Sequence, residues 1–320
     1  MRGIAVWGLG PHALKNIIPA ITDSRSVRLV GVCSRSDVKR LEASASWRCA
    51  SWASPEEMLE DSRVDAVYVA TPTGMHFAHG MQVLGAGKHL LCEKSLTAAP
   101  ADALVLVECA REKRLVLHEG FAFLHHPRLL AVRESVSASG FGAVLHAFCC
   151  FGLPPLEAPG FRNDPQLGGG ALLDVGCYPI AAMLALFGGD VSVLHARIVS
   201  SASALIDTHG DANLLFGGNV RADISWGYNR SYAADLLVHG ERQSLVANRL
   251  FSKLTFPDSR VILRDLAGVP GDLALPPFNG FHGLFDAFVR AMEDDRSRLQ
   301  LLDDALRRAG VMEAVMRSAR

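Results

Sequence analysis

The chain has 320 residues, with 32 Lys and Arg against 33 Asp and Glu, so its formal net charge is −1. This balance excludes the basic excess that draws a protein to nucleic acid or to an anionic membrane. Hydrophobic residues make up 49% of the chain and charged residues 20%, which is typical of a globular protein and excludes a disordered or fibrous one. Because one domain holds about 100–200 residues, the length favours two domains.

The N-terminal stretch Met1–Gly10 lacks the long apolar run of a secretory signal, so we expect a cytoplasmic protein. Seven cysteines contain no CxxC pair, which favours a reducing compartment and predicts neither a disulfide nor a metal site. The apolar stretch Gly168–Gly189 contains Asp174, Tyr178 and Pro179, so we interpret it as a core segment and not as a membrane span.

Short apolar runs alternate with helical patterns in the first part of the chain. This alternation is typical of parallel strands covered by helices on both faces, so it predicts a doubly wound α/β domain over residues 1–122. The predicted strands are Gly3–Trp7, Val27–Cys33, Ala66–Ala70, His89–Cys92 and Leu115–His118, and the predicted helices are His12–Ile21, Pro55–Glu60, His76–Ala86 and Ala99–Lys113.

Longer strand patterns with few helices between them follow from Gly142 onwards. They predict a second domain, 123–320, built on a large and mostly antiparallel sheet. The predicted strands are 144–151, 191–200, 212–216, 220–226, 234–239, 244–247, 254–256 and 260–263, and the predicted helices are 171–187, 281–293 and 302–317. The last two helices could also pack on the first domain. In 220–226, Val220, Ala222, Ile224 and Trp226 share one face, which is consistent with burial against helices or against a partner.

A glycine-rich turn directly follows the first predicted strand. Gly8–Ala13 reads GLGPHA, which matches G-x-G-x-x-A at the start of a helix. Small residues permit a tight turn, and the helix N-terminus offers unpaired N–H groups to a pyrophosphate. The position therefore predicts a dinucleotide site, for which the expected contacts are Gly8, Leu9, Gly10, Pro11 and His12.

The residues after the second strand indicate which dinucleotide is bound. An acidic residue at this place would bind the 2′-hydroxyl of NAD, but the chain has Ser34 and Arg35, followed by Asp37 and Lys39. A guanidinium and a hydroxyl suit a 2′-phosphate. We therefore predict NADP(H), bound here by Ser34, Arg35 and Lys39, with Asp37 as the competing ribose ligand.

Polar residues also follow two further strands. Thr71, Pro72 and His76 come after 66–70, and Glu93 and Lys94 come after 89–92. In an open α/β sheet the carboxyl ends of the strands form the ligand crevice. Lys94 could thus reach a substrate carbonyl or hydroxyl, and Glu93 the nicotinamide ribose.

Taken together, these motifs resemble those of the Gfo/Idh/MocA oxidoreductase family. The resemblance rests on the Gly8–Ala13 turn, on Ala70-Thr71-Pro72 with His76, on Glu93–Lys94 and on the segment GGGALLDVGCY at 168–178. It implies a Rossmann domain followed by an α/β domain with a large open sheet, and a nicotinamide held between the two. It also implies a homodimer or homotetramer that associates through the open face of the second sheet.

Catalytic roles follow from the same resemblance. Lys94 would be the lysine of the E-K-P motif, while Asp174 and Tyr178 match the family's D-x-x-x-H/Y pair. Ser95 replaces the usual proline, often preceded by a cis peptide, and so leaves the local backbone geometry open. The segments around Glu119 and Arg162 look like those of nucleotide-sugar 3-ketoreductases, which adds these two residues to the expected cofactor contacts.

The resulting hypothesis is an NADP(H)-dependent ketoreductase of a nucleotide-linked deoxysugar, acting at C3. Tyr178 would donate the proton, Lys94 would stabilise the oxyanion and Asp174 would orient the sugar; Tyr178 and Lys94 could also exchange roles. Arg128 and Arg133 are candidate phosphate contacts. One alternative is a dehydrogenase of free sugars, polyols or trans-dihydrodiols. The other is a non-catalytic NADP(H) sensor, against which the joint presence of the three catalytic candidates argues.

Overall fold

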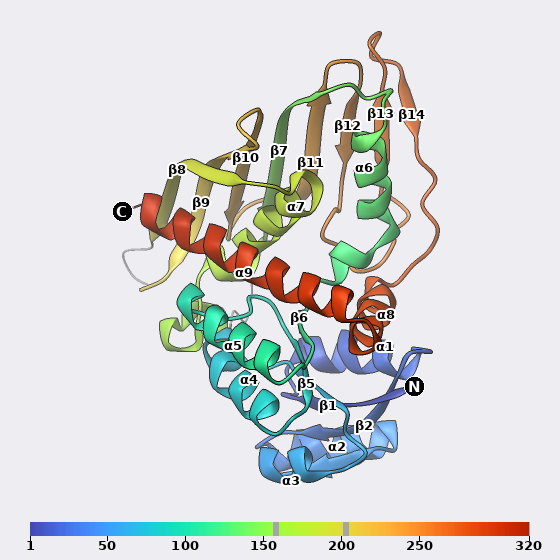
Figure 1. The fold of residues 1–320 in the computed structure, drawn as a ribbon, viewed down its shortest axis with the longest axis vertical. Helices are drawn as coiled ribbons and strands as arrows, with labels where there is room; N and C mark the ends of the chain where they lie inside the picture. Colours follow the sequence, from blue (N-terminus) through green and yellow to red (C-terminus); the bar gives the residue numbers. More distant parts are fainter. Residues whose placement is uncertain (156–159, 201–204, 320) are drawn as a thin grey trace. The chain divides into compact units, whose positions relative to one another are not determined.

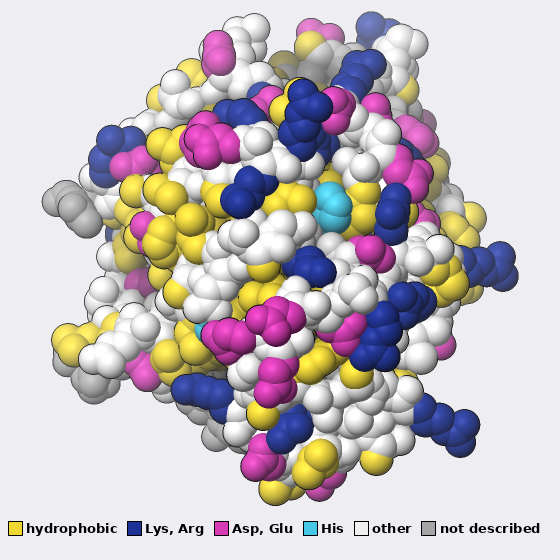
Figure 2. Space-filling model, turned by 60° about the horizontal axis from the view of Figure 1, so that its bottom comes forward, with side chains coloured by type: hydrophobic (Ala, Val, Ile, Leu, Met, Phe, Trp, Pro, Cys, Tyr) yellow, Lys and Arg dark blue, Asp and Glu magenta, His cyan; other side chains and the backbone are white. Residues whose placement is uncertain are grey.

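The structure is a computed structural model and describes residues 1–155, 160–200 and 205–319. By its internal contacts the chain divides into two compact units. The first comprises Met1–Phe121 and Phe281–Ala309, and the second comprises Ala122–Gly280 and Gly310–Arg320. Charged side chains of both signs are interspersed over the face shown in Figure 2.

The described residues of the first unit form a six-stranded parallel sheet in the order β3-β2-β1-β4-β5-β6. This arrangement confirms the predicted doubly wound parallel sheet (Figure 1). Its strands are buried apolar runs, as expected for a sheet covered on both faces. They are β1 (Arg2–Trp7), β2 (Val27–Cys33), β3 (Ala50–Trp52), β4 (Ala66–Val69), β5 (His89–Cys92) and β6 (Leu117–Glu119).

The helices of this unit connect consecutive strands. A π-helical turn, Ala13–Ile17, leads into α1 (Ile18–Thr22) after the glycine turn. The other helices are α2 (Asp37–Trp47), α3 (Pro55–Glu60), α4 (His76–Gly85) and α5 (Pro100–Glu112). The sequence did not predict α2, because only Ala43 of this helix is buried and its apolar periodicity is therefore weak.

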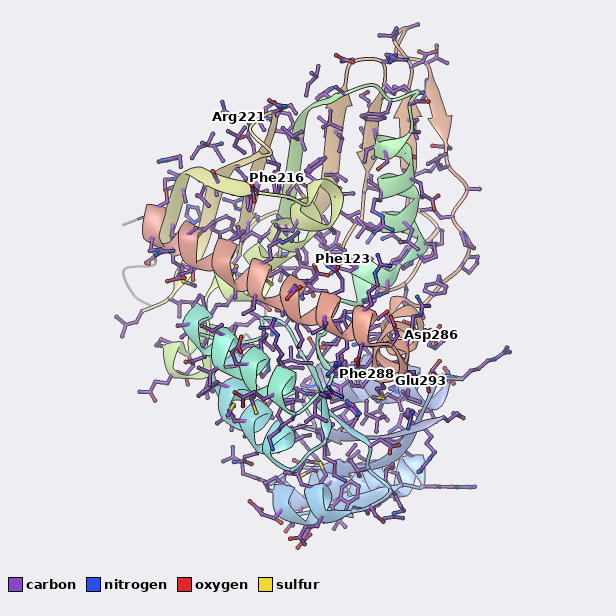
Figure 3. The ribbon with its side chains drawn as sticks, viewed as in Figure 1. Phe123, Phe216, Arg221, Asp286, Phe288 and Glu293 are labelled. Carbon is purple, nitrogen blue, oxygen red and sulfur yellow. The ribbon has the colours of Figure 1, made fainter. Side chains whose placement is uncertain are left out.

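Helix α8 (Gly280–Glu293) packs against the first unit although it lies late in the chain. The ring of Phe285 meets that of Tyr68 edge-on at 6.5 Å, and Phe288, labelled in Figure 3, stacks on His118 at 6.4 Å. Glu293 pairs with Arg2. The first turns of α9 (Asp295–Ser318), up to Ala309, belong to the same unit.

The described residues of the second unit form an eight-stranded sheet in the order β14-β13-β12-β11-β7-β10-β9-β8. Only β7 and β10 pair in parallel in this described sheet, which confirms the predicted mostly antiparallel arrangement. The strands are β7 (Val144–Gly152), β8 (Val191–Ser200), β9 (Asp207–Phe216), β10 (Val220–Gly227), β11 (Ala233–Gly240), β12 (Ser244–Ala247), β13 (Val261–Arg264) and β14 (Pro270–Asp272).

Three details of the second unit differ from the prediction, one of which is that β14 (Pro270–Asp272) was not predicted. The expected strand 254–256 is wrong: these residues lie in an irregular loop, where Leu254 makes a single bridge to Asn279. The sequence also missed α6 (Pro127–Ser137), which starts with Pro127 after the capping side chain of His126. Its positively charged and β-branched residues hide the apolar stripe.

Helix α7 (Cys177–Phe187) and the π-helical turn Leu172–Gly176 cover one face of this sheet (Figure 1). Ala222, Ile224 and Trp226 are buried on this side, and a Cβ atom on Gly176 would come within 2.9 Å of the Trp226 ring. The apolar side chains of β10 are therefore covered by helices, one of the two possibilities that their alternation left open. Among the described residues one helical stretch, Pro165–Phe187, is long and apolar enough to cross a membrane, and 72% of its apolar window is buried, as in a core helix.

Candidate active site

The turn after β1 has the backbone that a pyrophosphate cradle needs. Gly8 has φ +106°, and a Cβ atom there would lie 2.8 Å from the carbonyl group of Ala70. At Gly10 an added Cβ atom would meet no heavy atom within 4 Å, so there is space beside the helix start. Leu9 points into the core, with 4% of its surface exposed. The residues present therefore fit a dinucleotide at the predicted place.

The end of β2 presents cationic and hydroxyl groups. The side chain of Arg35 is exposed, and Ser34 Oγ accepts a hydrogen bond from the Ser36 N–H (3.2 Å). Asp37 lies in the first turn of α2, where its carboxylate pairs with Arg40 at 2.6 Å. The nearest acidic residue is thus engaged in an ion pair within its own helix.

Trp7 and His79 were not identified from the sequence as neighbours of this edge of the sheet. Their rings stack with centroids 4.0 Å apart, and Thr71 Oγ1 lies 3.0 Å from His79 Nδ1. Burial, with smaller contributions from the nearby His76 and Arg35, lowers the pKa of His79 to about 4. The ring is therefore neutral at neutral pH. The spacing of His76 and His79 on α4 is the signal that could have indicated this cluster.

His76 has a different role from the expected contact with the cofactor. Its side chain is buried, and its two ring nitrogens lie 2.8 Å from the carbonyl oxygens of Thr71 and Ser95. Burial lowers the pKa of this imidazole. Because the ring connects the segments after β4 and β5, we assign His76 as a positioning residue for the Lys94 loop.

Glu93 and Lys94 follow β5, as predicted. The Glu93 carboxylate accepts a hydrogen bond from the Tyr68 hydroxyl (2.7 Å) and lies 3.2 Å from His12 Nε2. Its second oxygen accepts from the backbone N–H of Lys94 at 3.3 Å. His12 of the glycine turn and Glu93 of the neighbouring strand are thereby brought together, and Lys94 is half-buried beside them.

Glu119 also differs from the expected cofactor contact. One carboxylate oxygen accepts the Leu96 N–H at 2.8 Å, and the other pairs with Arg308 of α9 at 2.7 Å. Only 5% of the Glu119 side chain is exposed. Glu119 is therefore a buried residue that holds the loop after Lys94 through the Leu96 N–H.

In the second unit, Asp174 lies in the π-helical turn at the start of α7 and is buried. Arg162 Nε donates to its Oδ2 at 2.6 Å, and the Tyr228 hydroxyl lies 3.2 Å from the same oxygen. Burial opposes the charge of Arg162, but Asp174 outweighs this effect and the pKa of the guanidinium is raised. Arg162, predicted to contact the cofactor, thus also forms an ion pair with Asp174.

Tyr178 lies one helical turn after Asp174 and is enclosed by three phenylalanine rings. Phe151 meets its ring edge-on at 5.0 Å, Phe251 lies at 5.3 Å and Phe123, labelled in Figure 3, at 5.6 Å. We call these three residues the Phe cage. They come from three separate segments, so no local pattern in the sequence could have indicated them.

Family profiles match both parts of the chain. The profile of the GFO/IDH/MocA oxidoreductase family with an NAD-binding Rossmann fold matches residues 2–121, and that of the GFO/IDH/MocA C-terminal domain matches residues 129–246. A dTDP-3,4-didehydro-2,6-dideoxy-α-D-glucose 3-reductase from Saccharopolyspora spinosa is 33% identical over 90% of this chain and 86% of its own length. The chain belongs to the Gfo/Idh/MocA oxidoreductase family. It is an oxidoreductase, as predicted.

Two further members of the family are informative. A 3-ketoreductase from Actinomadura kijaniata, solved in complex with NADP and TDP-benzene, has a TM-score of 0.93 and 28% identity over 100% of this chain and 98% of its own. An NADP(+)-dependent D-xylose 1-dehydrogenase from Haloferax volcanii is 26% identical over 90% of this chain and 88% of its own length. The family thus includes enzymes for nucleotide-linked and for free sugars.

Ser95 is the one departure from the Gfo/Idh/MocA motif that the sequence showed. The Lys94–Ser95 peptide bond is cis, His76 contacts the carbonyl oxygen of Ser95, and Glu119 accepts a hydrogen bond from the Leu96 N–H. Among the described residues, no group of three His, Cys, Asp or Glu side chains is placed to hold a metal ion.

Proposed function

We propose that this member of the family is an NADP(H)-dependent ketoreductase that reduces the C3 carbonyl of a nucleotide-linked deoxysugar. The observation that carries the proposal is the pairing of Asp174 with Arg162 beside a tyrosine in an apolar cage. Because Asp174 is paired with a cation, we assign it the orientation of the substrate and assign the proton transfer to Tyr178. The relatives named as dTDP-sugar 3-reductases and the TDP-benzene complex support the choice of substrate.

The dinucleotide, when bound, supplies a hydride to the carbonyl carbon. The carbonyl oxygen then needs a proton, for which we propose the Tyr178 hydroxyl, because the pKa of a tyrosine permits donation to an alkoxide. We propose that the Lys94 ammonium stabilises the negative charge on that oxygen and lowers the pKa of Tyr178. The three rings of the Phe cage pack against the phenol ring and thereby limit its rotation.

Asp174 has the properties of a substrate-orienting acceptor. The guanidinium of Arg162 and the hydroxyl of Tyr228 both lie within hydrogen-bond distance of its Oδ2, which favours the ionised carboxylate. An ionised carboxylate accepts hydrogen bonds from sugar hydroxyls but has no proton to donate. This assignment leaves Tyr178 and Lys94 as the candidate proton donors.

We propose NADP(H) as the cofactor, held by the glycine turn and by Ser34, Arg35 and Lys39. Replacing Arg35 with Asp removes a charge-assisted contact to the 2′-phosphate and adds a repulsive charge. We expect the Kd of NADPH to rise about 10- to 100-fold, as measured by nicotinamide fluorescence. The Kd of NADH should stay the same or fall.

Arg25→Asp is the matched control, because Arg25 is an exposed arginine at the opposite end of β2. It should leave the Kd of both dinucleotides unchanged. If the wild-type protein binds NADH as tightly as NADPH, the assignment of Ser34 and Arg35 to a 2′-phosphate is wrong.

The nucleotide part of the substrate is tested separately, with TDP as the probe and the NADPH complex in the calorimeter cell. Binding of TDP together with reduction of dTDP-3,4-didehydro-2,6-dideoxy-α-D-glucose supports the proposal. If TDP does not bind and D-xylose or another free sugar is oxidised with NADP⁺, the protein is a free-sugar dehydrogenase, the alternative that the H. volcanii relative favours.

We propose further that copies of the chain associate through the sheet face opposite α7. Phe148 is 40% exposed there, beside a cavity of about 380 Å³ whose lining includes Leu237 and Val246. Covering this apolar surface favours a homodimer or homotetramer. We expect Phe148→Asp to yield a monomer in light scattering after gel filtration, whereas Leu266→Asp, on an exposed turn, should not change the mass. A monomeric wild-type protein would contradict this proposal.

A further inference from the structure

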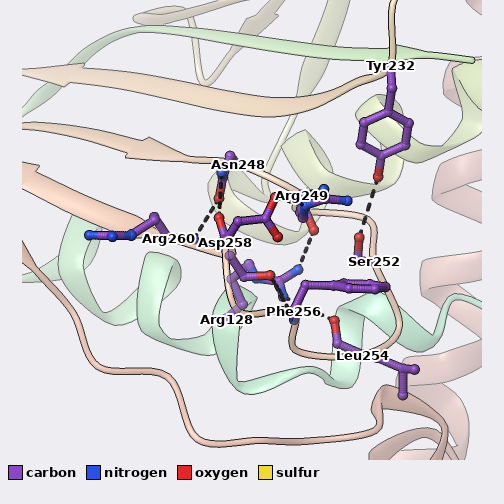
Figure 4. Close-up of polar contacts among 10 residues, drawn as sticks. Arg128, Tyr232, Asn248, Arg249, Ser252, Leu254, Phe256, Asp258 and Arg260 are labelled. Carbon is purple, nitrogen blue, oxygen red and sulfur yellow. Dashed lines mark hydrogen bonds and ion pairs between the residues drawn. The ribbon is translucent and has the colours of Figure 1, made fainter.

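Arg128, at the start of α6, is a completely buried arginine. Its Nη1 donates to the carbonyl oxygen of Arg249, and its Nη2 donates to the carbonyl oxygen of Leu254 (3.3 Å) and to Ser259 Oγ (3.0 Å) (Figure 4). All three acceptors are neutral, and the buried Nε has no hydrogen-bond partner among the described residues. Burial lowers the pKa of Arg128 to about 10, so its charge persists at neutral pH. This burial contradicts the expected phosphate contact, because the ligand cannot reach the guanidinium.

The three acceptors belong to one loop, which connects β12 to β13. The loop has little regular structure: its residues form turns, such as the one closed by the Ser252 N–H and the Arg249 carbonyl (3.0 Å). The guanidinium contacts it at three points along its length. A planar group with several donors in a fixed geometry can reach such separate acceptors, whereas a lysine ammonium cannot. Arg128 therefore determines the course of the loop.

The same loop carries Phe251 of the Phe cage. Phe251 is buried, and its ring lies 5.3 Å from Tyr178, 4.9 Å from Phe151 and 5.1 Å from Phe123. Phe123 lies in the short helical turn Ala122–His125, which comes shortly before Arg128 in the chain. Between them, His126 Nδ1 caps α6 and His126 Nε2 lies 3.1 Å from Thr255 Oγ1 of the loop. One short segment thus supplies a cage residue and the arginine that holds the loop of another cage residue.

We propose that Arg128 is a positioning residue for the reaction: by holding the 249–259 loop against the segment that carries Phe123, it places the Phe cage around Tyr178. This inference rests on the proposed role of Tyr178 as the proton donor. In this proposal Arg128 contacts neither the substrate nor the cofactor. A displaced cage would allow the phenol ring to turn away from the carbonyl oxygen.

The test variant is Arg128→Lys, which keeps the charge but loses the planar fork. We expect kcat for the dTDP-linked ketosugar to fall about tenfold, because an ill-positioned proton donor loses much of its contribution. The Kd of NADPH should stay within twofold of wild type. Arg260→Lys is the matched control: Arg260 flanks the same loop and is exposed, and its side chain pairs with Asp272 (Figure 4 labels Arg260).

The decisive measurement is the double variant Arg128→Lys/Tyr178→Phe. If Arg128 acts through Tyr178, the lysine substitution has no further effect on kcat once the hydroxyl is gone. An equal loss in both backgrounds, an altered Kd of NADPH, or an unchanged kcat of Arg128→Lys would overturn the inference. If Tyr178→Phe by itself keeps full activity, the proposed role of Tyr178 as the proton donor fails instead, so the two failures are distinguishable.

A spectroscopic readout is independent of turnover. The chain has four tyrosines, so the ionisation of Tyr178 can be extracted from the difference between the wild-type and Tyr178→Phe absorbance titrations. We expect Arg128→Lys to change the pKa obtained in this way, and Arg260→Lys to leave it unchanged. If Arg128→Lys does not fold, Ser259→Ala removes one acceptor only. It should lower kcat about threefold without changing the Kd of NADPH, and an unchanged kcat would overturn the inference.

Discussion

Tyr178→Phe is expected to lower kcat for ketone reduction by about 10²–10⁴-fold, because it removes the proton donor and leaves the ring in place. The phenylalanine ring keeps the packing against the Phe cage, so the variant should keep the wild-type fold. The Kd of NADPH should also be unchanged. Steady-state kinetics and fluorescence titration check the two expectations.

Tyr232→Phe is the matched control, since it removes the same hydroxyl from an exposed tyrosine of the same unit, where the hydroxyl lies 3.5 Å from Ser252 Oγ. Its kcat should equal that of wild type. If Tyr178→Phe retains activity within threefold while Lys94→Met loses it, the proton comes from Lys94 and the roles of the two residues are exchanged.

Glu119→Leu should be the most destabilising of the substitutions considered. It breaks the buried ion pair with Arg308, whose two side chains are 5% and 12% exposed, and leaves an uncompensated guanidinium in the interior. The expected loss in the free energy of unfolding is about 3–5 kcal/mol, measured by urea denaturation. The Leu96 N–H loses its acceptor as well, so kcat should fall through displacement of the Lys94 loop.

The double variant Glu119→Leu/Arg308→Met separates the ion pair from the packing. Because both charges are then replaced by apolar side chains, we expect it to regain part of the lost stability. Asp303→Asn is the control: Asp303 pairs with Arg111 at 3.1 Å, and the two side chains are 59% and 37% exposed. Its loss should be at most about 1 kcal/mol. A similar loss for Asp303→Asn and Glu119→Leu would contradict the assigned importance of burial.

Local patterns were sufficient for most of the first unit. The boundaries of β2, β5 and α3 agree with the sequence prediction, because each is a continuous apolar run or a capped helix whose signal lies within a few residues. The glycine turn could also be predicted locally, because it directly follows a strand that the sequence indicates. The structure shows why a glycine is needed there: Gly8 has a positive φ and lies close to the backbone of Ala70. The second sheet was predicted as mostly antiparallel, but one of its strands was misplaced.

The misplaced strand and the reassigned site residues have a common cause. The segment 254–256 has a strand-like composition, but a buried guanidinium far away in the chain holds it in a loop. Arg162 and Glu119 were predicted as cofactor contacts, and the structure adds ion pairs with Asp174 and Arg308, which are 12 and 189 residues away in the chain. No local rule predicts which of several charged residues will be paired in the interior.

The amino-acid sequence by itself therefore determined the fold class, the family, the glycine turn and the candidates Lys94, Asp174 and Tyr178. These depend on spacings of a few residues, which backbone geometry converts directly into a turn or a helix face. Only the tertiary structure decided which residues surround them. These are the Phe cage, the Arg162–Asp174–Tyr228 cluster, the positioning residues His76 and Glu119, and Arg128 with the 249–259 loop. Such contacts join distant segments, and their strength depends on burial, which no short stretch of sequence specifies.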